Sequence, residues 1–138
     1  MSDATMHIEV VSAESHVLSA DISELYARSV EGEFGILPGH QPGVFALEIA
    51  PVTLRYPDGS SQRIAVHRGT LFVDQESRII LLADIAELES EIDISRARRR
   101  KRELEQRIAD GVDDAVLRAS LVKQDVRLQV ADEPVESA

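Results

Sequence analysis

The spacing of apolar residues changes once along this chain, near residue 90, and that change most constrains the fold. Before it, apolar and polar residues alternate over short stretches such as His7–Val11 and Gln62–Val66, so that one face of each stretch is suited to burial in a sheet. Turn residues separate these stretches; within 56–60, Pro57 and Gly59 suit a tight turn. Many short strands without intervening helices are typical of an antiparallel sandwich or barrel, and of these two we expect the sandwich.

After residue 90 the pattern predicts two helices. Asp93 suits the cap of the first helix and Asp110-Gly111 its end, while Asp113 suits the start of the second. The expected apolar stripes are Ile94, Ala97, Leu104 and Ile108 on the first helix, interrupted by Lys101, and Val112, Ala115, Ala119, Val122 and Val126 on the second. Two antiparallel helices of this size form a hairpin that buries too little apolar area to be stable alone. We therefore expect the hairpin to pack on the sandwich or on another protein, and a hairpin that does both is a two-state element.

The predicted fold class is therefore mainly β plus α, with an N-terminal antiparallel β-sandwich followed by a C-terminal two-helix hairpin. We expect the sandwich domain to span residues 1–88 and the hairpin residues 89–130. Residues 131–138 are expected to form a flexible, solvated tail.

Charge and composition argue against several classes of protein. The formal net charge of −10 disfavours a nucleic-acid partner, because phosphates need a basic face. The N-terminus MSDATMHIEV lacks the basic and apolar regions of a secretory signal, and no apolar run reaches the roughly 18 residues of a spanning helix. If the chain meets a membrane, we therefore expect it to do so through other proteins. Residues 91–138 hold 10 of the 15 basic residues, so the two regions are expected to have different partners.

The chain also lacks a convergent catalytic or metal site. Absence of cysteine excludes disulfides and thiolate nucleophiles, and no G-x-S-x-G motif is present. The loop with Gly32, Gly35 and Gly39 lacks the Lys-Ser/Thr and the helix that a phosphate-binding loop needs. Metal-ligand spacing is absent among the four histidines, His7, His16, His40 and His67. We expect neither enzymatic activity nor a required cofactor.

Several stretches, collinear over residues 6–130, resemble the epsilon family of F-type ATP synthase subunits, in its bacterial form. They are Val10–Glu14, Glu31–His40 with Pro42 and Ala46-Leu47, Arg68–Val73 with Ile80–Asp84 and Ala86-Glu87, and Ile92–Ala97. The chain departs from the family at Arg68-Gly69, where two adjacent glycines are frequent, and at Gly43-Val44, where two leucines are frequent.

The resemblance implies a sandwich of about ten strands that binds the gamma subunit and rests on the c-ring as part of the rotating central stalk. It implies a non-catalytic subunit that couples proton transport to ATP synthesis, peripheral on the cytoplasmic face of the cell membrane. The residues expected at the c-ring are Glu31, Gly32, Glu33, Phe34 and Gly35, and His40 is expected toward gamma. In many bacterial members the helices either extend along gamma and block ATP hydrolysis or fold back against the sandwich.

Some family members bind regulatory ATP in the folded-back hairpin, through a motif similar to Ile92–Ala97 and an upstream glutamate. The residues that match are Glu87, Asp93, Arg96 and Ala97, with Lys123 or Arg118 on the second helix. Arg96 suits phosphate oxygens, and a carboxylate can accept from an adenine amine or a ribose hydroxyl. The simpler interpretation is that Asp93 is only a helix cap and Arg96 a surface residue.

A basic cluster follows that motif. Its members beyond Arg96 are Arg98, Arg99, Arg100, Lys101 and Arg102. Without interleaved aromatic residues it is a poor nucleic-acid site, which leaves a solvated helix face paired with Glu103 and Glu105, or a surface for an acidic partner. The resemblance implies that this partner is an acidic segment of the catalytic beta subunits, which assemble with alpha subunits.

Two hypotheses of different classes follow. In the first, the chain is the rotor subunit, whose hairpin restrains hydrolysis. In the second, it is a free-standing nucleotide-sensing module, a β-sandwich whose hairpin closes over a nucleotide. Association with ATP synthase subunits distinguishes the two.

Overall fold

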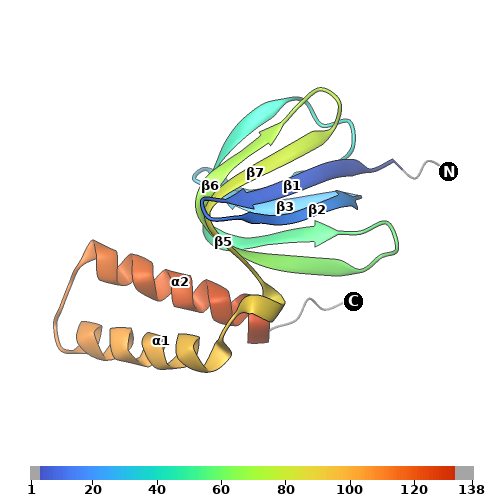
Figure 1. The fold of residues 1–138 in the computed structure, drawn as a ribbon. Coiled ribbons are helices and arrows are strands. Elements are labelled where there is room, and N and C mark those ends of the chain that lie inside the picture. Colours follow the sequence, from blue (N-terminus) through green and yellow to red (C-terminus); the bar gives the residue numbers. More distant parts are fainter. Residues whose placement is uncertain (1–3, 133–138) are drawn as a thin grey trace.

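The computed structural model describes residues 4–132 as seven strands, one short 3-10 helix and two α-helices (Figure 1). The strands are β1 (Met6–Ser12), β2 (His16–Ile22), β3 (Glu24–Ser29), β4 (Gly32–Ile36), β5 (Gly43–Arg55), β6 (Ser61–Val73) and β7 (Arg78–Leu88). They are followed by η1 (Glu89–Glu91), α1 (Ile94–Ala109) and α2 (Ala115–Asp132). The predicted class, a β-rich domain followed by two helices, is confirmed.

All seven strands belong to one sheet, in the order β2-β1-β7-β6-β5-β3-β4. Neighbouring strands are antiparallel except β1 and β7, which run parallel with His7 opposite Arg78. The sheet is therefore mixed, a detail that differs from the antiparallel sandwich predicted. Local alternation shows which face of a strand is buried, but it does not report the direction of the neighbouring strand.

The strand count also differs, because β5, β6 and β7 are long. β5 and β6 each have 13 residues and pair without a change of register on either side of Arg68. The inward-facing residues nevertheless change parity there: Ile64 and Val66 face the core before Arg68, and Leu71 and Val73 face it afterwards. Each long strand thus behaves as two short alternating stretches joined at a bend, which explains the larger number expected.

Arg68 and Gly69 make this bend. Arg68 has a φ of 63°, in the left-handed region that disfavours side chains with a Cβ. At Gly69, a Cβ would lie 2.4 Å from the carbonyl oxygen of Leu82 and 2.8 Å from the Cα of Ala83. Glycine is therefore required at position 69, whereas position 68 is occupied by a strained arginine.

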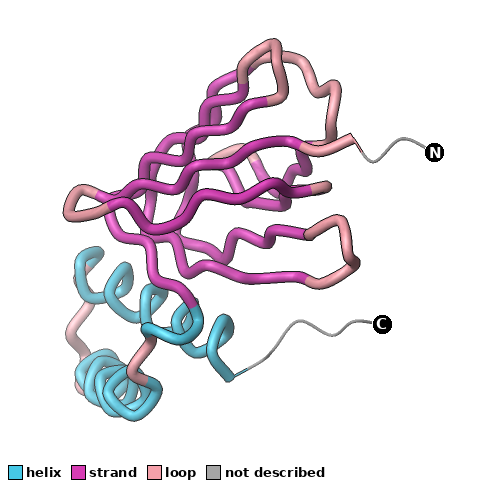
Figure 2. The backbone as a smooth tube through the Cα atoms, turned by 45° about the vertical axis from the view of Figure 1, so that its right-hand side comes forward, coloured by secondary structure: helices cyan, strands magenta, loops and turns pink. Residues whose placement is uncertain are grey.

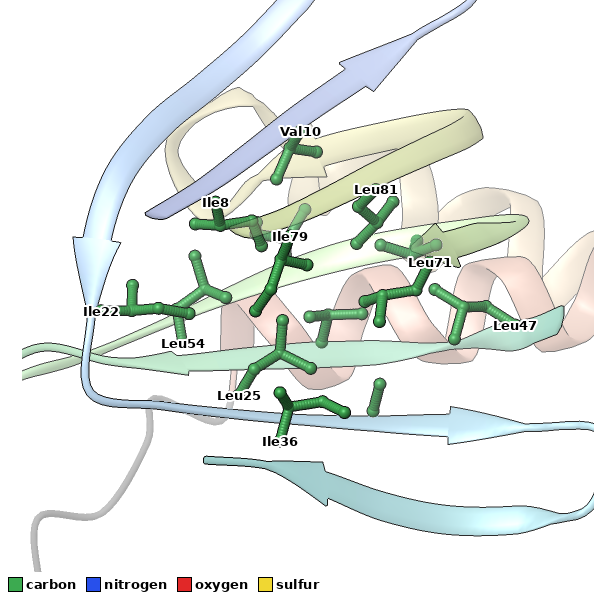
Figure 3. Close-up of a cluster of buried hydrophobic side chains, with 14 of the residues drawn as sticks. Ile8, Val10, Ile22, Leu25, Ile36, Leu47, Leu54, Leu71, Ile79 and Leu81 are labelled. Carbon is green, nitrogen blue, oxygen red and sulfur yellow. The ribbon is translucent and has the colours of Figure 1, made fainter. Parts of the chain in front are cut away.

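The main core is aliphatic and lies between the folded-over parts of the sheet (Figure 3). It includes Ile8 and Val10 from β1, Leu54 from β5, Leu71 from β6 and Leu81 from β7, all of them buried. A second, smaller cluster joins the sheet to the hairpin: Ala65, Ile92, Val126 and Val130. The hairpin is therefore attached to the sandwich by far less apolar surface than holds the sandwich itself together.

Of the two helices, α2 lies between α1 and the sheet and packs on β5 and β6 (Figures 1 and 2). Asp93 caps α1 by accepting a hydrogen bond from the Arg96 backbone N–H at 3.0 Å, as predicted. The second helix begins at Ala115, two residues after the Asp113 expected at its start, and the Asp114 carboxylate accepts from the Val116 N–H at 2.7 Å.

The apolar stripe predicted for α2 is also only partly right. Val126 is buried, but Val112 and Val122 are exposed, while Leu117, Gln124 and Val130 are buried instead. Because α2 contacts both α1 and the sheet, its buried residues do not fall on one stripe. The tail predicted from residue 131 begins inside α2, which ends at Asp132, and residues 133–138 lie outside the part described.

Candidate functional site

A cleft of about 280 Å³ lies where β7, α1 and α2 meet; we call it the hinge cleft. It is lined by Glu87, Glu91, Asp93, Arg96, Ala97, Arg100, Gln124 and Arg127. Four of the five candidate ATP-binding residues therefore lie together, although they come from β7 and α1. Lys123 is not among the lining residues, and the basic residue that α2 contributes is Arg127.

Glu87 is the centre of the polar contacts in the hinge cleft. Its Oε1 accepts a hydrogen bond from Arg127 Nε at 2.7 Å and another from His67 Nε2 at 3.0 Å. Arg127 also donates from Nη1 to the Gln124 side chain at 3.2 Å. His67, Glu87 and Arg127 thus connect β6, β7 and α2 through one carboxylate oxygen of Glu87.

These contacts set the charge of Glu87. Burial by itself raises the pKa of this carboxyl, but the hydrogen bonds from His67 and Arg127 and the positive charge of Arg127 outweigh it and leave the pKa below its ordinary value. Glu87 is therefore ionised near neutral pH. His67 is 2% exposed, and among the described residues its Nδ1 has no hydrogen-bond partner, so its ring is oriented by the packing around it and by the hydrogen bond to Glu87.

The α1 side of the hinge cleft carries further charged groups. Asp93 uses its Oδ1 for the helix cap, and Glu91 accepts from the Leu88 backbone N–H at 2.9 Å, so both carboxylates already have structural roles. Arg96 is exposed, and Arg100 makes a 3.4 Å contact with Glu103. Two α1 guanidinium groups are thus positioned to bind phosphate oxygens, while Arg127 is the third cation in the cleft.

Arg127 and Arg100 were missed as cleft residues by sequence reasoning. Arg100 falls one turn beyond Arg96, and this spacing was a usable signal for placing it on the same helix face. Arg127 had no local signal, because it is 40 residues from Glu87 in the chain.

The residues predicted to contact other subunits lie in the turn before β4, on β4 itself and in the loop after it. Glu31 lies in the turn that joins β3 to β4, and Glu33 pairs with Arg28 at 3.1 Å. Phe34 stacks on Phe45 with ring centroids 4.4 Å apart, and the His40 ring meets the same Phe45 at 6.0 Å. The two predicted contact regions are therefore joined through one aromatic side chain. Gly32 takes a φ of 126°, and at Gly35 a Cβ would lie 2.9 Å from the Tyr26 ring.

The predicted inhibitory cluster is divided by the structure. Lys101 pairs with Asp125 of α2 at 2.9 Å and so holds the hairpin together, and Arg100 lines the hinge cleft. Arg98, Arg99 and Arg102 are exposed on α1, and Arg99 and Arg102 make no ion pair with any described residue. The exposed basic surface of α1 therefore contains fewer residues than the basic cluster predicted from the sequence.

Within the described part of the chain, no group of three or more acidic or histidine side chains is arranged to hold a metal ion. None of the helices described there is both long enough and apolar enough to cross a membrane.

Comparison with known proteins gives a consistent result. Residues 5–89 match the family described as the ATP synthase delta/epsilon chain, beta-sandwich domain. The chain is 43% identical over 127 residues to an ATP synthase epsilon chain of Streptomyces avermitilis, covering 91% of this chain and 94% of that one. It is 33% identical over 131 residues to the epsilon chain of Moorella thermoacetica, covering 93% and 97%.

A solved structure extends the likeness to the fold. A chain in the cryo-EM structure of the Euglena gracilis mitochondrial ATP synthase, OSCP/F1/c-ring, superimposes with a TM-score of 0.71 at 18% identity. The match covers 92% of this chain and 77% of that one, so it includes helices as well as the sandwich.

Proposed function

This chain belongs to the ATP synthase epsilon-chain family, a non-catalytic subunit, and from this premise we propose that it is a rotor part of the central stalk. In this role the sandwich binds gamma and rests on the c-ring, and so couples proton transport to ATP synthesis. Membrane contact occurs only through the complex, on the cytoplasmic face of the cell membrane. The β4 turn and the Phe34–Phe45–His40 group are the surfaces we assign to these partners.

The hairpin is the regulatory part in this proposal. The observation that carries it is the weak, polar attachment of α2 to the sandwich: a small apolar cluster and the 2.7 Å contact between Arg127 and Glu87. Such an attachment can be exchanged for contacts with another protein at modest cost, as a two-state element requires. When released, the hairpin presents Arg99 and Arg102 to the catalytic alpha and beta subunits and inhibits ATP hydrolysis.

Regulatory ATP is the second component of the proposal. The hinge cleft offers Arg96, Arg100 and Arg127 for phosphate oxygens and Glu87 for a hydroxyl or amine donor. Because the cleft exists only when the hairpin is folded back, bound nucleotide stabilises that state according to how far its concentration exceeds Kd. Nucleotide would thus hold the inhibitor away from the catalytic subunits.

The rate of ATP hydrolysis by the assembled complex tests the inhibitory role. The complex is prepared with the intact chain and with a chain ending at Ser90, which lies in η1 between β7 and α1. We expect truncation to raise the rate with assembly unchanged. A full-length Arg99→Glu, Arg102→Glu chain should raise it as well, while Arg118→Glu, at the start of α2, is the control for reversing an arginine charge elsewhere on the hairpin.

An unchanged rate in both variants would contradict inhibition and leave the sandwich as a coupling part. Co-purification with the gamma subunit tests the proposed place of the sandwich in the central stalk. A chain that binds nucleotide but fails to associate with gamma would instead be a free-standing sensor module.

A further inference from the structure

Arg63 of β6 lies on the face of the sheet on which α2 packs. Ala65, two residues along the strand and so on the same face, is fully buried and belongs to the cluster formed with Val126 and Val130 of α2. A cavity of about 620 Å³ lies between this face and α2, and its lining includes Arg63 and four residues of α2: Val122, Asp125, Val126 and Gln129. The surroundings of Arg63 therefore include the hairpin in its folded-back position.

The guanidinium group of Arg63 is partly buried without compensation. Its Nε and Nη2 atoms are inaccessible to solvent, and neither has a hydrogen-bond partner among the described residues. Asp125, which lines the same cavity, pairs with Lys101 at 2.9 Å. Glu33, the other carboxylate in the lining, pairs with Arg28 at 3.1 Å. Nε and Nη2 of Arg63 thus lose their hydration and gain no hydrogen bond in return.

Such burial has an energetic consequence for the hairpin. A charged donor that is buried without a hydrogen bond is less stable than the same group in water. When α2 leaves the sheet, this face is uncovered and water can hydrate Nε and Nη2. We propose that Arg63 destabilises the folded-back hairpin and so biases the two-state element toward release. It acts against the Glu87–Arg127 contact and the apolar cluster, which hold the hairpin on the sheet.

These opposing contributions bring the two states closer in free energy, so that a partner of moderate affinity can shift the population. The consequence for hydrolysis rests on the proposed function: Arg63→Met strengthens docking and should raise the hydrolysis rate of the assembled complex. Docking itself does not rest on that function. It is measured on the isolated full chain, and so the result stands even if truncation after Ser90 leaves hydrolysis unchanged.

Hydrogen exchange of the Arg63 Nε–H, followed by NMR in the full chain, tests whether α2 is what buries this group. We expect the Nε–H to exchange only when α2 leaves the sheet, and therefore to be protected from exchange. Arg127→Ala, which weakens docking, should speed exchange of the Arg63 Nε–H and of the α2 amides by the same factor. An Arg63 Nε–H that exchanges equally fast in wild type and in Arg127→Ala would overturn the proposal.

The variant Arg63→Met tests the sign of the effect, because it removes the charge and keeps a long, unbranched side chain. We expect the α2 amides to exchange about tenfold more slowly than in wild type. Arg55→Met is the matched control and should leave α2 exchange unchanged, because Arg55 is exposed on β5 and lies outside the cavity. Unchanged or faster α2 exchange in Arg63→Met would contradict a destabilising role. If that variant does not fold, the comparison of wild type with Arg127→Ala can still overturn the proposal.

Discussion

Arg127 of α2 donates a hydrogen bond from Nε to Oε1 of Glu87 on β7 at 2.7 Å, across 40 residues of chain. Both side chains are about a quarter exposed, and the same oxygen accepts from the buried His67. This contact is the polar link between the hairpin and the sandwich. The first two predictions concern its strength and its charge.

Replacing Arg127 by alanine should weaken docking of the hairpin by about 2 kcal/mol, because Glu87 loses a charge-assisted hydrogen bond while remaining partly buried. Amide hydrogen exchange would report this as faster exchange throughout α2, with the core strands unchanged. Arg118→Ala is the control, since Arg118 and Asp113 form an exposed pair worth less than about 1 kcal/mol. Equal exchange in the two variants would show that the Glu87 contact does not hold the hairpin.

Stability should depend on pH through Glu87. Its pKa is lower in the folded protein than the ordinary value of about 4.3. The ionised carboxylate therefore stabilises the fold fully above that ordinary value, and the contribution is lost as the pH falls through the lower, folded-state pKa. Urea unfolding is measured from neutral pH down to about pH 3. The free energies of unfolding of wild type and Glu87→Gln should converge at the acid end. A constant difference between these free energies at every pH would contradict a stabilising, ionised Glu87.

Arg68→Gly should stabilise the protein by about 0.5–1 kcal/mol. Arginine at a φ of 63° is strained by about 1 kcal/mol or more, and the extra flexibility of glycine in the unfolded chain offsets part of the gain. Thermal or urea unfolding measures the change. Arg55→Gly, at a strand position without positive φ, should instead destabilise by about 1 kcal/mol. A loss of stability in Arg68→Gly would mean that the arginine side chain makes contacts that outweigh its strain.

Gly69→Ala should destabilise the sandwich by about 3 kcal/mol or more, because its Cβ would meet backbone atoms of Leu82 and Ala83 that cannot move independently. Gly43→Ala provides the comparison. There the new Cβ would meet only the end of the Phe45 ring, at 3.2 Å, and a small rotation relieves the contact. We expect Gly43→Ala to cost less than about 1 kcal/mol. Similar unfolding midpoints for the two variants would rule out the close approach of β6 and β7.

The sequence by itself determined the elements of this protein and the boundary between them. Apolar residues recur about every two residues before residue 90 and about every 3.6 residues after it. This spacing reports which face of each segment is buried, and it is a local property of the chain. For the same reason Asp93 was identifiable as a cap, since a capping side chain bonds to a backbone N–H three residues away. The four candidate cleft residues, in contrast, were expected only from the resemblance to the ATP synthase epsilon family.

Only the tertiary structure decided the contacts between distant segments. The parity change at Arg68 depends on its left-handed backbone, and alternation alone cannot reveal it. Pairing of β1 with β7, of Glu87 with Arg127 and of Lys101 with Asp125 requires elements far apart in the chain to pack together. The burial of the Nε and Nη2 atoms of Arg63 also depends on packing, which the strand pattern alone does not report. Burial of a polar group is a consequence of packing, and so its chemistry is decided by the fold rather than by its neighbours in sequence.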